Sequence, residues 1–157
     1  MHRLLPIATI VLALAACGRD PAPAPSAAPA TTASASASTT VGGVTLQAST
    51  VAIADLNDAV AARYGIDRAQ DGLLLLVTVR DAAGNGTDPG DLQLSATAAA
   101  LPDPPKPLEL RAIQADGMTD YLGVLRATPP ASVQFRVIAT RNGSRADIAS
   151  TAELYPR

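Results

Sequence analysis

The chain has 157 residues, of which 48% are hydrophobic and 17% charged, and its formal net charge is −2. This length has room for one domain, and without a clustered basic excess the chain does not have the composition of a nucleic-acid-binding protein. The only histidine, His2, and the only cysteine, Cys17, exclude a disulfide framework and a Cys/His zinc site.

Residues 1–16 have the layout of a secretory signal peptide. His2 and Arg3 form a short basic segment, an apolar run follows over residues 4–13, and small residues precede Cys17. The apolar run is shorter than the roughly 20 residues that a membrane-spanning helix needs. We therefore expect this segment to direct export.

The tetrapeptide Leu14-Ala15-Ala16-Cys17 resembles the lipobox of bacterial lipoproteins. The resemblance implies cleavage before Cys17 and transfer of a diacylglycerol to its thiol, and several acyl chains hold a protein firmly on a membrane. Inner-membrane lipoproteins often carry Asp after the acylated cysteine, whereas this chain has Gly18. The pattern thus resembles that of outer-membrane lipoproteins facing the periplasm. The alternative is an ordinary signal peptide with an incidental cysteine.

Residues 17–42 are predicted to form a disordered tether that starts at the acylated cysteine. Pro, Ala, Ser and Thr make up nearly all of it, and such a segment buries too little apolar surface to offset the entropy lost on ordering. Its role is either that of a spacer that holds a domain off the membrane or that of a linker without a required length.

Residues 43–157 are predicted to form an all-β, immunoglobulin-like sandwich of about seven strands, because alternating apolar and polar residues recur between turn signals. The predicted strands cover residues 44–49, 73–80, 92–98, 108–112, 121–128, 133–140 and 145–155. Asn142-Gly143 predicts a tight type I′ hairpin. Four prolines within 102–107 predict a crossover that stays outside the hydrogen-bonded ladders.

One short helix is predicted over residues 55–65. Asn57 suits its N-cap and Gly65 its C-terminal end, while Leu56, Val60 and Tyr64 share one face. A helix this short needs packing to hold it.

The segment around this helix resembles the domain-of-unknown-function family 4426, a family of small exported proteins of Gram-negative bacteria. The matching positions are Leu56, Val60, Ala61, Tyr64, Gly65, Ile66 and Arg68. Residues 73–79, 110–113, 121–123 and 133–137 keep the family order, so the resemblance covers about residues 43–157. It implies an exported β-rich domain and supplies no activity. Ala69 stands where members commonly have Ser, and Tyr121-Leu122 where a pair of aromatics is common.

The sequence predicts no catalytic residue, no cofactor and no metal site. Processing removes His2 and acylates Cys17, so a Ser-His or Cys-His nucleophile is excluded. A copper site would need His and Met ligands, and Met118 alone remains. Glu109 and Glu153 are expected on outward strand faces, and the aspartates in turns.

The segment 81–91 collects four oxygen-bearing side chains, Asp81, Asn85, Asp88 and Asp91. Calcium uses such ligands, but the spacing does not match an EF-hand, and the same residues are common in hairpin loops. An ordinary loop is the favoured interpretation.

Tyr64 and Arg68 are the candidate binding residues. In a functional role, the Arg68 guanidinium would take an anionic group such as a carboxylate or phosphate. In a structural role, Tyr64 would fix the helix to the sandwich and Arg68 would pair with Asp67, Asp71 or a backbone carbonyl. The structural role is favoured.

Together these features predict a lipid-anchored, non-catalytic binding or assembly module that docks on another envelope protein. The alternatives are a carrier of a small ligand such as a glycan or peptide, and a hydrolase with carboxylate chemistry. The membrane, through the lipid anchor, and an envelope protein are the expected partners, with no nucleic acid. The sequence leaves the oligomeric state open.

Overall fold

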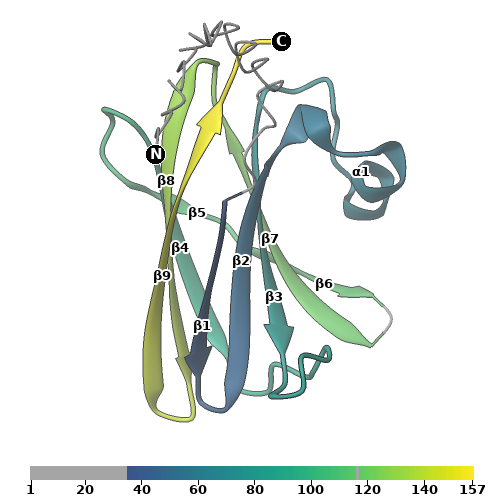
Figure 1. Cartoon of the computed structure of the whole chain (residues 1–157), viewed down its shortest axis with the longest axis vertical. Coiled ribbons are helices and arrows are strands. Elements are labelled where there is room, and N and C mark those ends of the chain that lie inside the picture. The colour runs from purple at the N-terminus through teal and green to yellow at the C-terminus, as the bar shows by residue number, and fades with distance from the viewer. Residues whose placement is uncertain (1–34, 116) are drawn as a thin grey trace, which may run out of the picture.

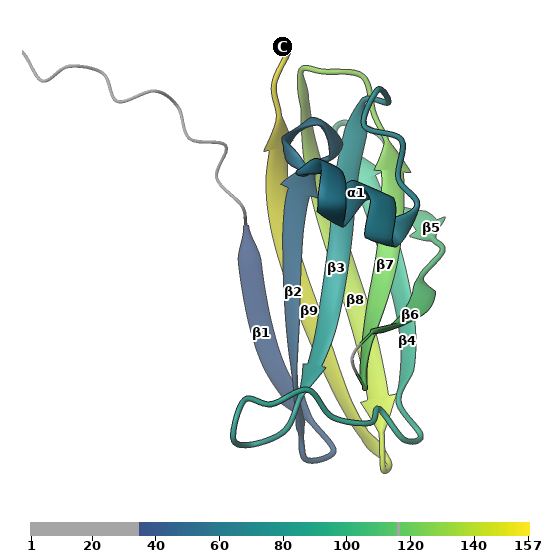
Figure 2. The same cartoon turned by 90° about the vertical axis from the view of Figure 1, so that its right-hand side faces the viewer.

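The structure is a computed structural model that describes residues 35–115 and 117–157. The predicted signal peptide, Cys17 and most of the predicted tether lie outside these residues. In the described part, two antiparallel sheets pack face to face as an all-β sandwich, which confirms the predicted fold class (Figures 1 and 2).

The strands are β1 (Ser36–Val41), β2 (Val44–Ala52), β3 (Gly72–Arg80), β4 (Gln93–Ala100), β5 (Lys106–Leu108), β6 (Arg111–Ala115), β7 (Met118–Arg126), β8 (Ala131–Arg141) and β9 (Ser144–Leu154). A 3-10 helix, η1 (Ile53–Asp55), and one α-helix, α1 (Asp58–Tyr64), follow β2. The five-stranded sheet has the order β1-β2-β3-β7-β6, and the four-stranded sheet the order β5-β4-β8-β9.

The described residues hold nine strands, two more than predicted. The first extra strand is β1, which lies inside the segment predicted to be a disordered tether. It pairs with β2 from Ser36↔Ser49 to Val41↔Val44, and Val41 is buried. Gly42 and Gly43 both have positive φ and form the tight turn between the two strands. Backbone pairing and this turn order a Ser/Thr/Ala segment whose composition alone predicts disorder, so the domain begins earlier than residue 43.

The second extra strand arises because the predicted strand 108–112 is divided between the sheets. β5 pairs with β4 in one sheet, and β6 pairs with β7 in the other. Pro107 lies in β5 opposite Thr97, so the prediction that this proline stays outside the ladders is wrong. β5 is an edge strand, where a proline nitrogen can face away from the neighbouring strand.

The main core fills the space between the sheets, and β3 is buried along most of its length. Leu73 and Leu75 point into this core, together with Phe135 of β8. Leu74 faces the opposite side, where α1 covers it in a second apolar cluster. Both faces of β3 are therefore buried at this end, and Figure 2 shows α1 over the outer face of the five-stranded sheet.

Local capping signals determine the bounds of α1. The Asn57 side chain accepts a hydrogen bond from the Val60 N–H at 2.8 Å, and Gly65 adopts the left-handed conformation at the other end. The predicted N-cap and C-terminal glycine are both confirmed. In the described residues, no helix is long and apolar enough to span a membrane.

Candidate functional site

Tyr64, the first predicted site residue, is the last residue of α1, and 9% of its surface is exposed. It belongs to the second apolar cluster, with Leu56 and Ala61 of the helix segment and Leu74 and Leu122 of the sheet. Burial raises the pKa of Tyr64, and the Asp120 carboxylate raises it further. Its position is that of a residue that fixes the helix to the sheet.

Arg68, the second predicted site residue, binds back to the start of the helix. Its guanidinium pairs with Asp58, the first residue of α1, and donates to the Ala54 carbonyl at 3.2 Å. The carbonyl contact is of the expected kind, whereas the partner carboxylate is neither Asp67 nor Asp71. Asp71 pairs with Arg157 instead, at 3.2 Å. The contacts of Arg68 connect the segment after α1 to the start of the helix. They do not join Arg68 to Tyr64.

Asp120 is a half-buried carboxylate, whereas the sequence predicts the aspartates in turns. It lies on β7, opposite Ile113 of β6 and Thr78 of β3. Burial raises the pKa of Asp120, while the nearby charges of Arg80 and Arg63 oppose that rise. The predicted strand began at residue 121, so this position fell outside it.

The oxygen-bearing side chains of segment 81–91 make separate contacts, some local and one with a distant part of the chain. Asp81 accepts hydrogen bonds from the backbone N–H groups of Ala83 and Asn85, which lower its pKa. Asp91 accepts from the Asn142 N–H at 3.0 Å. Within the described residues, no three His, Cys, Asp or Glu side chains form a group suited to a metal ion.

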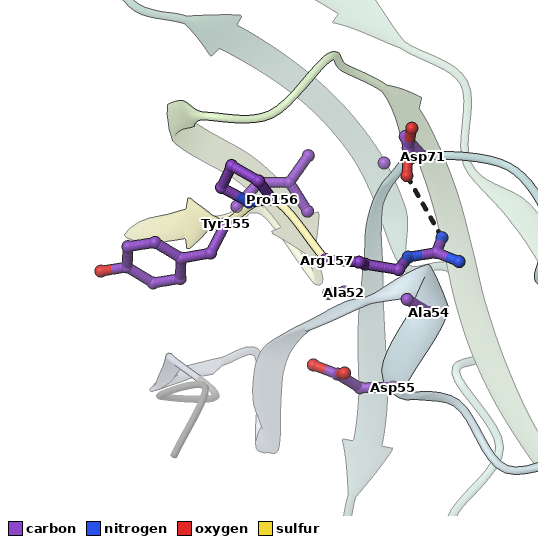
Figure 3. Close-up of a pocket in the computed structure, with 9 residues that line it drawn as sticks. Ala52, Ala54, Asp55, Asp71, Tyr155, Pro156 and Arg157 are labelled. Carbon is purple, nitrogen blue, oxygen red and sulfur yellow. Dashed lines mark hydrogen bonds and ion pairs between the residues drawn. The ribbon is translucent and has the colours of Figure 1, made fainter. Parts of the chain in front are cut away.

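A cavity of ≈ 290 Å³ lies at the end of the sandwich where the chain terminates. Asp55, Asp71 and Arg157 supply its charged groups. Figure 3 shows the Arg157 side chain directed at Asp71, whereas the ring of Tyr155 points away from the pair. One carboxylate of this cavity is therefore held by an arginine, in an arrangement that stabilises the C-terminal segment.

The exposed edge of the five-stranded sheet is a more distinctive feature. β6 is the last strand of this sheet and extends from the body of the sandwich (Figure 1). Arg111, its first residue, donates a hydrogen bond to the carbonyl of Tyr64 at the end of α1. Cationic side chains are favourable at a helix C-terminus, where backbone carbonyls lack partners. The edge strand and the helix therefore form one connected surface.

Two depressions flank β6, one on each face of the sheet. The helix-side depression, of ≈ 350 Å³, is lined by residues 62–64 of α1, by Gly65 at its C-terminal end and by residues 111–113 of β6. The loop-side depression, of ≈ 470 Å³, is lined by Asp88 and Pro89, by Ala112 and Gln114 of β6, and by residues 117–119 and Tyr121. Ala112 borders both depressions, whereas Arg111 and Ile113 line the helix-side one and Gln114 the loop-side one, as the pleat of a strand requires.

Burial raises the pKa of Tyr121 in the loop-side depression, and the Asp88 carboxylate raises it further. Neither depression is predicted from the sequence. Their one available signal was the alternation in residues 111–114, where the polar residues Arg111 and Gln114 fall on opposite faces.

The fold is similar to solved structures of low sequence identity. A DUF4426 family protein, PA0388 from Pseudomonas aeruginosa PAO1, matches with a TM-score of 0.59 and 15% identity, over 78% of this chain and 96% of that one. FetP from uropathogenic E. coli strain F11, a protein recombinantly expressed in the periplasm of E. coli, matches with a TM-score of 0.51 and 12% identity, over 81% of this chain and 98% of that one.

A comparison with curated proteins finds no match. The model of the domain of unknown function DUF4426 matches residues 38–156, which is nearly all of the described structure and includes β6 and both depressions. The resemblance expected from residues 56–68 is thereby confirmed. The chain belongs to the DUF4426 family.

Proposed function

We propose that the chain is a lipid-anchored module of the cell envelope that faces the periplasm and binds another envelope protein without catalysing a reaction. The lipobox-like Leu14-Ala15-Ala16-Cys17 supports the anchor, and Gly18 supports the outer membrane. The similar fold of FetP, which was expressed in the periplasm, supports an envelope location. The absence of histidine beyond His2 supports a non-catalytic role.

The observation that carries the binding proposal is the β6 edge with a depression on each face. A strand at a sheet edge presents unpaired backbone N–H and C=O groups. An extended partner segment would pair with these groups, and its alternate side chains would enter the two depressions. Main-chain hydrogen bonds would then supply affinity, and the depressions would supply specificity.

The other three edge strands offer less room for an added strand. β1 and β9, at the edges of different sheets, lie against each other. β5 has three residues with Pro107 at its centre, and proline lacks the N–H that pairing needs. In the described residues, β6 is thus the edge strand best suited to pairing.

Photocrosslinking in living cells tests the docking surface. A photoreactive residue replaces Gln114, which is exposed on β6, or Gln134, which is exposed on β8 of the other sheet. We expect one reproducible envelope protein to crosslink from position 114 and not from position 134. Crosslinking of that protein from position 134 alone would contradict docking at β6.

A proline scan separates backbone pairing from side-chain contact. In an antiparallel ladder, neighbouring residues direct their N–H groups alternately toward and away from the paired strand. One of Ala112→Pro and Ile113→Pro therefore removes a β6–β7 bond, and the other removes only an outward donor. We expect the variant that keeps the wild-type unfolding temperature to lose the crosslink from position 114. A crosslink that survives in that variant would exclude strand addition.

The lipid anchor is tested separately with Cys17→Ser. Metabolic labelling with an alkyne analogue of palmitate should mark the wild-type chain and not the variant. Fractionation should place the labelled chain in the outer membrane. An unlabelled wild-type chain released into the periplasm would favour the ordinary signal peptide instead.

A further inference from the structure

We propose that the β6 edge selects an extended partner segment that carries acidic side chains toward α1 and neutral or basic side chains toward the loop of Asp88. This inference rests on the proposed strand addition and specifies its partner. The depressions on the two faces of β6 differ in charge, and an added strand points alternate side chains at one or the other.

The helix-side depression is basic. Arg63 and Arg111 line it, and none of its lining residues in the described part of the chain is a carboxylate. Arg111 donates to the Tyr64 carbonyl, which is neutral, so its charge is not cancelled by that contact. The four ion pairs of the described residues involve other arginines, those at positions 68, 136, 141 and 157.

Asp120 is a carboxylate on the sheet that interacts with this basic group. It lies opposite Ile113 in the register of β6 and β7, and it interacts with both Arg80 and Arg63. Among the described residues, Arg63 and Arg80 thus interact with this one carboxylate, and Arg111 adds a third positive charge on the helix-side face. Asp58, at the other end of α1, is paired with Arg68. The surplus positive charge favours an acidic side chain entering from solvent.

The loop-side depression has the opposite character. Among its described lining residues Asp88 is the one that is charged, and the others are neutral, among them Gln114, Met118 and Tyr121. The Asp88 carboxylate accepts a hydrogen bond from the Gly90 N–H, a neutral donor, at 2.8 Å. An acidic side chain is disfavoured here, whereas a neutral or basic one is accommodated.

The same charges argue against a second copy of this chain as the occupant. If two β6 strands paired across a twofold axis, the two helix-side faces would form one continuous surface. Arg63 and Arg111 of both copies would then lie on that one surface, and the juxtaposition of like charges disfavours the pairing. The occupant that fits is a segment of a different protein with alternating acidic residues.

Selection from a peptide library tests the inference directly. The probe is a displayed library of random eight-residue peptides, selected on the full chain held in detergent at low ionic strength, where electrostatic selection is strongest. We expect the enriched peptides to carry Asp or Glu at every second position. Their affinity should fall about three- to tenfold in Arg63→Glu, whose side chain makes no ion pair that would be lost.

The matched control is Arg126→Glu, which reverses an exposed arginine at the other end of β7 and should leave affinity unchanged. A second outcome is a set of enriched peptides that alternate polar and apolar residues without acidic ones, and that lose binding to the stable one of the variants Ala112→Pro and Ile113→Pro. That result would overturn the charge inference and keep strand addition. Enriched peptides without any alternation, which bind that proline variant as well as wild type, would overturn both the charge inference and strand addition.

Discussion

The guanidinium of Arg111 donates a hydrogen bond to the carbonyl of Tyr64, 47 residues earlier in the chain. This contact ties the edge strand β6 to the C-terminal end of α1. It also satisfies a carbonyl that the helix leaves without a partner. The surface proposed to receive a partner strand therefore depends on the stability of the helix.

We expect Arg111→Ala to lower the free energy of unfolding by about 1 kcal/mol, because it removes a charge-assisted hydrogen bond at a helix terminus. Urea denaturation of the purified chain measures the change. The control is Arg136→Ala, which removes an exposed surface pair and should cost less than about 0.5 kcal/mol. Equal losses in the two variants would show that the cap contributes nothing specific.

The opposite end of α1 gives a second prediction. Asn57→Ala removes the side chain that accepts from the Val60 N–H, and N-cap losses of this kind cost about 1 kcal/mol. Asn57→Asp keeps an accepting oxygen at the same position and should retain most of the stability. Denaturation curves of the two variants make the comparison. A wild-type midpoint for Asn57→Ala would mean that packing alone holds the helix.

The helix was predictable from sequence because its signals are local. Asn57, Gly65 and the apolar spacing of Val60 and Tyr64 lie within a few residues of one another, and the structure places each as expected. The Asn142-Gly143 hairpin is predictable for the same reason, and both residues have positive φ. Short-range rules therefore suffice for these elements.

The β1 strand and the β6 edge depend on long-range pairing, which the local pattern does not contain. The residues of β1 read as a polar linker until β2 pairs with them. The basic face of β6 combines Arg63 and Arg111, which only the sheet register and the helix position bring together. The candidate site was missed because it is a property of the assembled sheet.

A third prediction concerns the turn between β1 and β2. A Cβ on Gly42 would lie 2.7 Å from the backbone oxygen of Arg141, and its φ of +51° disfavours other residues. Gly42→Ala should therefore lower the free energy of unfolding by more than about 1 kcal/mol. Gly84→Ala is the control, since its φ is also positive but a Cβ there meets nothing within 4 Å. Thermal unfolding that ranks Gly84→Ala as the more damaging change would contradict this close approach.

The last prediction is a pH dependence with a defined sign. Burial raises the pKa of Asp120 above its ordinary value of 3.8. The folded chain therefore binds this proton more tightly than the unfolded chain, and ionisation of Asp120 costs stability as the pH rises from 3.8 through the raised pKa. Asp120→Asn lacks that loss, so its unfolding free energy relative to wild type should increase over this interval. Urea denaturation at a series of pH values measures it.

Asp81→Asn provides the opposite case, because the backbone N–H of Asn85 lowers the pKa of Asp81. The Asp81 carboxylate contributes stability above pH 3.8 that is lost as the pH falls through the lowered pKa. The unfolding free energy of Asp81→Asn relative to wild type should therefore decrease as the pH rises through this interval. Parallel trends in the two variants would show that the burial of Asp120 does not govern its ionisation.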